Sequence, residues 1–256
     1  MKSRLKDAEN YPIINLRLLN YTIPFKLLSL RPIMKARQVT FIILLVVLAD
    51  QALKFYIKTH FFLDDSHKIM GDWFQLYFVE NEGMAYGWKF GGQAGKMMLT
   101  LFRLGAVIFG VWYLRSIIEK KYNRGFIVCA ALIFAGALGN LLDSMFYGLI
   151  FEASDRGHMA ALFPKHGYAG FLHGKVVDML YFPIIHDAHF PKWVPVWGGE
   201  EFVFFRPIFN LADASISTGV ITILVFQKRF LKHHLGNETN DTVETGAVVN
   251  DDVQVQ

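Results

Sequence analysis

Long apolar stretches alternate with polar, charged segments along this chain. The four apolar stretches cover 39–56, 97–114, 126–146 and 208–226. An α-helix needs about 20 mostly apolar residues to cross the hydrocarbon core of a bilayer. The pattern therefore predicts an α-helical integral membrane protein with four transmembrane helices. The first stretch is not a cleaved signal peptide, because Asp50, Lys54 and further spans follow it without a small-residue cleavage site.

Lysine and arginine residues are concentrated in three regions of the chain. They precede the first span, fill the short connection between the second and third spans, and follow the fourth span. Cytoplasmic loops of membrane proteins are enriched in these residues. We therefore expect both termini to be cytoplasmic and the longer connections, about 57–96 and 147–206, to face outward.

The two outer connections differ in their patterns. In the first, Trp73, Gln75, Tyr77 and Val79 alternate with Phe74, Leu76 and Phe78, which predicts a strand with two usable faces in a small sheet resting on the membrane surface. The second is rich in His, Gly and Pro, and we expect irregular insertions there. Apart from His186 and His189, which flank Asp187, its histidines lack the tight spacing of metal ligands, so we expect them to be solvated or interfacial.

Polar residues interrupt the spans at a limited set of positions. They include Asp50, Lys54, Asn140, Asp143, Asn210 and Asp213. Such residues are costly inside a bilayer and usually functional. At about 1.5 Å of rise per residue they fall in the outer half of the membrane, and pairs three or four apart share a helix face. Gly136 and Gly139 narrow the third helix there, which allows another helix to approach. We therefore expect one polar pocket that opens to the outer face.

Asp178 lies outside the spans, in an apolar segment that we expect to be a loop dipping toward the bilayer. Two carboxylates held together at low dielectric share a proton, so that one acts as a base on water while the other protonates the substrate carbonyl. Proton-coupled transporters use similar groups, and a non-catalytic scaffold would use the outer connection for binding. The inner halves of the spans are almost purely apolar, which disfavours a path for protons across the membrane.

Composition and charge refine the domain organisation. Hydrophobic residues make up 53% of the chain, and the net charge of +4 is too small to indicate nucleic-acid binding. The single cysteine, Cys129, has apolar neighbours and excludes an intrachain disulfide. We divide the chain into a basic cytoplasmic extension (1–37), a membrane domain (38–230) and a polar tail (231–256) that we expect to be disordered.

Five short motifs resemble, in their order, those of the lipoprotein signal peptidase (signal peptidase II) family. They are ADQALK at 49–54, ENEGMAYG at 80–87, GALGNLLDS at 136–144, VVDM at 176–179 and FNLADASI at 209–216. The resemblance covers about residues 38–226. It implies an aspartic endopeptidase of the bacterial cytoplasmic (inner) membrane. Such an enzyme cuts the signal peptide of a prolipoprotein just before a diacylglyceryl-modified cysteine.

The resemblance also implies roles for individual residues. Asp178 and Asp213 match the catalytic pair, and the matching pocket residues are Asp50, Lys54, Asn81, Gly83, Asn140, Asp143 and Asn210. No metal and no organic cofactor are implied. The implied partners are diacylglyceryl-modified prolipoproteins and membrane lipids, with no nucleic acid, and we expect a monomer.

The chain departs from the family pattern in its third motif and in two lengths. Asp143 is followed by Ser144, where the family usually has arginine. Arg206, near the outer end of the fourth span, is a candidate substitute, whereas Arg103 in the second span is expected to snorkel or to face the pocket. The segments 147–175 and 186–204 are longer than is usual in the family, and the sequence does not say what they do.

Overall fold

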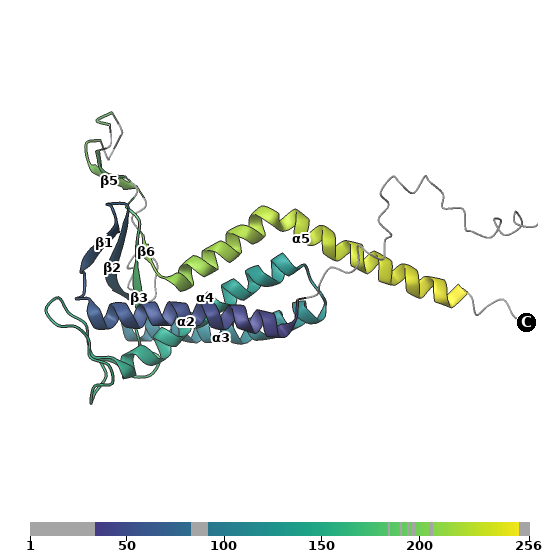
Figure 1. The fold of residues 1–256 in the computed structure, drawn as a ribbon, viewed down its shortest axis with the longest axis horizontal. Helices are drawn as coiled ribbons and strands as arrows, with labels where there is room; N and C mark the ends of the chain where they lie inside the picture. Colours follow the sequence, from purple (N-terminus) through teal and green to yellow (C-terminus); the bar gives the residue numbers. More distant parts are fainter. Residues whose placement is uncertain are drawn as a thin grey trace, which may run out of the picture. The chain divides into compact units, whose positions relative to one another are not determined.

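The computed structural model describes residues 34–82, 92–183, 185–189, 191–193, 195, 198–204 and 207–250. Its helices are α2 (Ala36–His60), α3 (Gly92–Glu119), α4 (Arg124–Ile150) and α5 (Leu211–Asn250). Its strands are β1 (Ser66–Met70), β2 (Phe74–Asn81), β3 (Val176–Tyr181), β4 (Ile185–His189), β5 (Glu201–Phe204) and β6 (Ile208–Phe209) (Figure 1).

Four helices among the described residues are long and apolar enough to cross a membrane. They are Ala36–His60, Gly92–Glu119, Arg124–Ile150 and Leu211–Phe230, which confirms the four predicted spans. The predicted start of the fourth span was wrong, because residues 208–209 form β6 and the helix begins only at Leu211. The backbone of α5 stays helical through 231–250, within the segment where we expected disorder.

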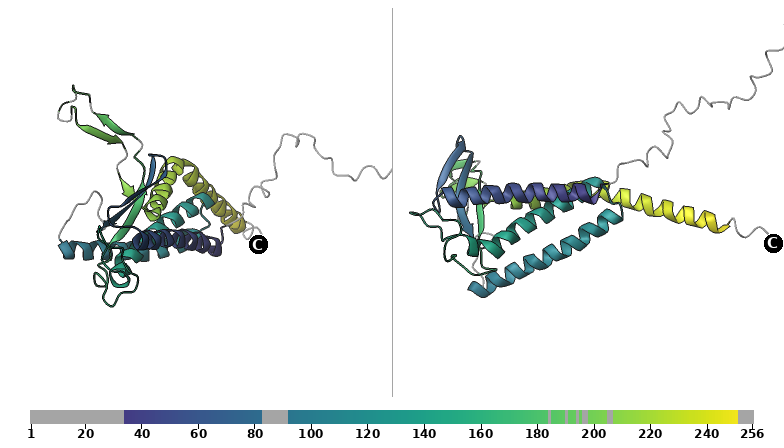
Figure 2. Two further views of the ribbon diagram at one scale, coloured as in Figure 1. Left: turned by 60° about the vertical axis from the view of Figure 1, so that its left-hand side comes forward. Right: turned by 60° about the horizontal axis from the view of Figure 1, so that its bottom comes forward.

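Helix α4 is the central helix of the membrane domain. It packs against α2, α3 and α5, and the right-hand view of Figure 2 shows it between α2 and α3. Half of the residues in its most apolar window are buried, against 17% in each of the other three spans. The other helices expose large apolar side chains such as Leu48, Phe102 and Val225. This distribution suits helices whose outer surfaces contact lipid.

Two glycines of α4 allow close approach of its neighbours, as predicted. A Cβ atom at Gly136 would fall 2.2 Å from the carbonyl oxygen of Ala212 in α5. A Cβ atom at Gly139 would fall 2.8 Å from Oδ2 of Asp50 in α2. The absence of side chains at these positions therefore lets α2 and α5 meet α4 where the polar residues lie.

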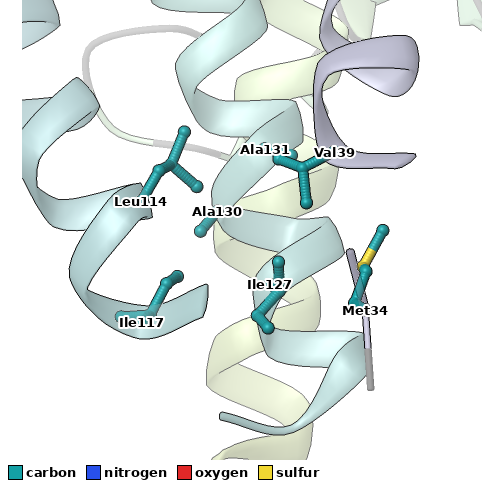
Figure 3. Close-up of a cluster of buried hydrophobic side chains, with 7 residues drawn as sticks. All are labelled: Met34, Val39, Leu114, Ile117, Ile127, Ala130 and Ala131. Carbon is teal, nitrogen blue, oxygen red and sulfur yellow. The ribbon is translucent and has the colours of Figure 1, made fainter. Parts of the chain in front are cut away.

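The ends of the helices remote from the sheet are joined by an apolar cluster, drawn in Figure 3. It comprises Met34, Val39, Leu114, Ile117, Ile127, Ala130 and Ala131. Cys129 is buried in the same part of α4 and has a free thiol, as expected for a packing residue. This part of the domain therefore anchors the bundle through apolar contacts.

A four-stranded antiparallel sheet lies at the other end of the bundle, where α2 ends and α5 begins (Figure 1). Its order is β1-β2-β3-β6, and β4 pairs with β5 in a separate hairpin. Strand β2 confirms the predicted strand of the first outer connection. The prediction of irregular structure was wrong for 176–181, since β3 is an inner strand of the sheet.

The sheet packs on the helices through one of its faces. Val177 and Met179 of β3 join Phe78 of β2 in a buried cluster with Ile57 of α2 and Tyr147 of α4. Side chains alternate between the two faces of a strand. The side chain between Val177 and Met179 therefore projects to the opposite face of β3, and this is where the candidate site lies.

Candidate active site

Asp178 occupies the middle of β3, whereas we had expected it to lie in a loop. Only 3% of the residue is exposed. Its Oδ2 accepts a hydrogen bond of 3.1 Å from Nδ2 of Asn81, and its Oδ1 accepts one of 2.7 Å from Nδ2 of Asn210. Both carboxyl oxygens are thus held by amide donors from different elements.

Asp213 lies in the first turn of α5. Asn210 precedes this helix, and its Oδ1 accepts the backbone N–H of Asp213 at 2.8 Å, in the manner of an N-cap residue. Oδ1 of Asp213 accepts a hydrogen bond of 2.7 Å from Nδ2 of Asn140. Asn210 therefore fixes the backbone of Asp213, while Asn140 fixes its side chain.

The two asparagines connect the two aspartates. Nδ2 of Asn210, besides donating to Asp178, lies 3.1 Å from Oδ1 of Asn140, which accepts a second hydrogen bond. The sequence has Asp178 and Asp213 in separate elements, and the structure brings them together through this chain of side chains. Both asparagines, which we expected near the aspartates, lie between Asp178 and Asp213.

The environment of Asp178 alters its acidity. Burial raises the pKa of Asp178 to about 7, and the negative charge of Asp213 acts in the same direction. The hydrogen bonds from Asn81 and Asn210 and the charge of Lys54 act against this rise without offsetting it. A carboxyl group with this pKa exchanges its proton near neutral pH, as acid–base catalysis requires.

Lys54 organises the polar groups of the neighbouring helices. Its fully buried Nζ lies 2.9 Å from Oδ2 of Asp50 and 2.7 Å from Oδ2 of Asp143. It also donates a hydrogen bond of 3.0 Å to Oδ1 of Asn140. Because an ammonium group only donates, it must face the amide oxygen of Asn140, which leaves the NH₂ group for Asp213. Lys54 thereby sets the orientation of Asn140.

Asp50 connects α2 to the start of α5. Its Oδ1 accepts the backbone N–H of Ala212 at 2.9 Å. The first N–H groups of a helix lack intrahelical partners, and a carboxylate is favourable at this end of the helix dipole. Asp50 therefore helps to fix the helix turn that carries Asp213.

Gln51 and Tyr147 belong to the same polar layer but were missed by the sequence analysis. Nε2 of Gln51 donates to Oδ1 of Asp143 at 2.8 Å and lies 3.2 Å from Oδ2 of Asp50. The hydroxyl of Tyr147 donates to Oε1 of Gln51 at 3.1 Å. Gln51 could have been found in the same way as Asn140, because each is an amide side chain within an apolar span. Tyr147 carried no such signal, because tyrosine is common near span ends.

Arg103 reaches the site from α3, so it faces the pocket and does not snorkel. Its Nη1 donates a hydrogen bond of 2.8 Å to Oγ of Ser144, which in turn donates to the carbonyl oxygen of Asn140 at 2.9 Å. The carboxylates of Asp213, Asp143 and Asp178 are the charges that act on the guanidinium. Ser144, where the sequence departs from the family pattern, is therefore where this guanidinium is bound.

Two residues suggested by the sequence, Gly83 and Arg206, lie outside the described residues. Among the residues that are described, no group of three or more His, Cys, Asp or Glu side chains is arranged to hold a metal ion. Asp50 and Asp143, the two acidic side chains beside the aspartate pair, are bound to Lys54. The arrangement suits acid–base chemistry by two carboxyl groups.

Comparisons with known proteins agree on one family. The family model described as signal peptidase (SPase) II matches residues 42–228. A lipoprotein signal peptidase of Porphyromonas gingivalis is 46% identical over 197 residues, which cover 76% of this chain and 84% of that protein. One of Amoebophilus asiaticus is 34% identical over 191 residues, which cover 73% and 76%. A solved bacterial membrane enzyme aligns at 23% identity with a TM-score of 0.49, covering 76% of this chain and 89% of that one. By the family model and the two sequence relatives, the chain belongs to the signal peptidase II family and is a membrane-spanning peptidase.

Proposed function

We propose that this protein is an aspartic endopeptidase that removes signal peptides from diacylglyceryl-modified prolipoproteins, cutting before the lipidated cysteine. The observation that carries the mechanism is the chain of hydrogen bonds from Asp178 through Asn210 and Asn140 to Asp213. The substrate class follows from the lipoprotein signal peptidases to which the chain is similar. The alternative of a proton-coupled transporter component is not favoured, since those relatives are peptidases.

In the resting enzyme Asp178 and Asp213 carry one proton between them, and this proton resides on Asp178. Burial favours the neutral form of Asp178, whose pKa is about 7. Asp213 accepts a hydrogen bond from the amide of Asn140 and lies in the first turn of α5, at the positive end of the helix dipole. Asp213 is thus suited to act as the base and Asp178 to act as the acid.

Hydrolysis then proceeds in two steps. Asp213 takes a proton from a water molecule whose oxygen attacks the scissile carbonyl carbon, while Asp178 gives its proton to the carbonyl oxygen. In the second step the tetrahedral intermediate returns a proton to Asp178, and Asp213 protonates the departing amide nitrogen as the C–N bond breaks. The products are a new carboxyl group and a new amine, and both aspartates regain their initial states.

The surroundings of the pair suit a substrate that is anchored in lipid. Apolar side chains are exposed on α2, α3 and α5, so acyl chains can contact the helices beside the site. The concentration of Lys and Arg before the first span, between the second and third spans, and after the fourth span supports cytoplasmic termini and an active site near the outer face of the inner membrane. We propose that a monomer is sufficient, since both aspartates and the asparagines that connect them belong to the same chain.

The decisive experiment is cleavage of a lipid-modified prolipoprotein by the purified protein and two variants. Asp178→Asn and Asp213→Asn should each abolish cleavage while thermal unfolding in detergent stays cooperative. Asp72→Asn, which changes an exposed carboxylate of the β1–β2 connection, is the matched control and should retain activity. Full activity of both active-site variants would refute the mechanism. Equal cleavage of the unlipidated precursor would refute the substrate class.

A further inference from the structure

A second buried group of charged side chains lies on the face of the sheet opposite Asn81. Glu80 of β2 pairs with Lys58 of α2, and its Oε2 accepts a hydrogen bond of 2.9 Å from Nζ of Lys175. Lys58 is fully buried, and the side chain of Glu80 is 4% exposed. Successive side chains of a strand point to opposite faces, so Glu80 points away from the active site while Asn81 points toward Asp178.

The connection between α4 and β3 completes this cluster. Ser154 Oγ accepts from Nζ of Lys58 at 2.8 Å and donates to Oε1 of Glu80 at 3.0 Å. The ring of Tyr168 lies 4.9 Å from Nζ of Lys58, and its hydroxyl accepts the backbone N–H of Lys175 at 2.6 Å. The segment 151–175 therefore contributes to the burial of Lys58 and Glu80.

The ammonium of Lys58 is also enclosed by aromatic rings. Phe151 and Phe78 have their centroids 5.3 Å and 5.9 Å from Nζ. The cluster holds two ammonium groups and one carboxylate, so the rings supply the further attraction that a surplus cation needs. Burial acts to raise the pKa of Glu80, but the charge and hydrogen bond of Lys58, and then those of Lys175, outweigh it and lower that pKa. Glu80 is thus held as a carboxylate.

This cluster joins the ends of the two strands that meet at the active site. In the antiparallel pairing of β2 with β3, Glu80 lies opposite Val177, Asn81 opposite Val176, and Val79 opposite Asp178. The ion pair between Glu80 and Lys175 therefore joins the end of β2 to the start of β3, on the face of the sheet opposite the active site. The position from which Asn81 donates its 3.1 Å hydrogen bond to Asp178 lies directly beside this ion pair.

Stability alone is a poor explanation for such a cluster. Replacing a buried ion pair by apolar residues of similar size is often neutral or stabilising. The site is surrounded by an apolar cluster that includes Ile57, Phe78 and Val177, so an apolar solution was available. The charged groups instead fix the geometry at the end of β2. Hydrogen bonds and ion pairs constrain the orientation of the groups that they join, whereas dispersion contacts do not.

We propose that Lys58, Glu80 and Lys175, braced by Ser154 and Tyr168, form a clamp that positions Asn81 against Asp178, with Glu80 as the positioning residue. This gives the connection 151–175 a function, namely to support the active-site strands on the face of the sheet opposite the active site. The inference rests on the proposed aspartic mechanism. It adds that Glu80, which points away from the active site, modulates the acidity of Asp178 through the hydrogen bond from Asn81.

The proposal predicts a shift in the pH dependence of cleavage. Among the described residues, the charged groups that act on Asp178 are Asp213 of α5, Lys54 of α2 and Arg103 of α3, and none of these three belongs to the clamp. The hydrogen bond from Asn81 favours the ionised form of Asp178. Glu80→Gln should weaken this bond and so raise the pKa of Asp178. The alkaline limb of the pH–rate profile, which reflects that pKa, should therefore move to higher pH. We expect kcat to fall roughly ten- to a hundredfold with KM changed less than about threefold.

The experiment uses the full chain in lipid nanodiscs with a lipid-modified prolipoprotein peptide, and compares Glu80→Gln, Asn81→Ala and the double variant. The clamp acts through Asn81, so Asn81→Ala should show the same shift, and Glu80→Gln should add nothing to it. Lys175→Met, at a side chain that is 34% exposed, breaks the Glu80–Lys175 ion pair with less risk to folding and should shift the limb in the same direction. The control is Arg156→Gln, which removes an exposed ion pair with Asp64 from the same connection and should leave the profile unchanged.

Two outcomes overturn the clamp. The first is a wild-type pH limb in both Glu80→Gln and Lys175→Met while each variant unfolds cooperatively. The second is an effect of Glu80→Gln that persists undiminished in the Asn81→Ala background, because Glu80 would then act by another route. Failure of the proposed mechanism is distinguishable, since it would appear as activity in Asp178→Asn and Asp213→Asn.

Discussion

Asn210 donates a hydrogen bond of 3.1 Å to Asn140, and each of these asparagines also donates to one aspartate of the pair. Asn210 holds Asp178 at 2.7 Å and Asn140 holds Asp213 at 2.7 Å. The relative position of the two carboxyl groups is therefore set by neutral amide groups from α4 and from the residue that caps α5.

Removal of the Asn140 amide should impair catalysis more than substrate binding. Asn140→Ala takes away the donor to Asp213 and the acceptor of Lys54. A hydrogen bond to a charged group contributes about 1.5–3 kcal/mol, so we expect kcat to fall about 10- to 100-fold. Single-turnover cleavage measures this directly. Ser215→Ala removes a hydroxyl that bonds only within α5 and should keep nearly full activity; equal losses in both variants would contradict the assignment.

Cleavage should be lost as the pH rises through neutrality. Asp178 must carry the shared proton to act as the acid, and its pKa is about 7. Below this pH the acid is protonated and competent; above it the proton dissociates and kcat/KM declines. The measurement is kcat/KM against pH in a detergent buffer of constant ionic strength. A rate that stays constant well above pH 7 would show that Asp178 does not supply the proton.

Arg103 should be required for efficient cleavage. Its guanidinium is the described cation of α3 that faces the aspartate pair, and Ser144 holds it at 2.8 Å. Arg103→Gln removes the charge and should lower kcat/KM roughly 30- to 100-fold, whereas Arg103→Lys keeps the charge and should lose about tenfold.

The requirement for the positive charge of Arg103 is also tested by moving the guanidinium from α3 to α4. Ser144→Arg in the Arg103→Gln background returns a guanidinium to the pocket at the position where the family usually has arginine. We expect this double variant to recover at least part of the lost kcat/KM. A double variant that is worse than Arg103→Gln alone, while still folded, would contradict a role for the charge itself.

The contact of α4 with α5 should not tolerate a methyl group at Gly136. A Cβ atom there would fall 2.2 Å from the carbonyl oxygen of Ala212, one residue before Asp213. Gly136→Ala should therefore destabilise the fold by about 1–3 kcal/mol and reduce activity as α5 is displaced. Gly105→Ala in α3 is the control, because a Cβ atom there meets nothing within 4 Å. Thermal unfolding compares the two; equal transition temperatures would count against the close approach.

Much of the fold could be predicted because it follows from local patterns. The apolar spans and the strand of the first outer connection follow from the local pattern, and the helical spacing of Asn140 and Asp143 in α4 placed them on one face, where both contact Lys54. β3 was missed since Val176 to Met179 are all buried, so the strand shows no alternation of polar and apolar residues. Short apolar runs of this kind cannot be assigned by periodicity alone.

The sequence by itself determined that this chain has four apolar spans and that their polar residues belong to one pocket, because a charged group in lipid must find polar partners. It did not determine which partners these are. The pairing of Arg103 with Ser144, the orientation of Asn140 by Lys54, and the approach of Asp178 to Asn210 depend on how helices rotate and how strands pair. Those relations join residues far apart in the chain, so only the tertiary structure decided them.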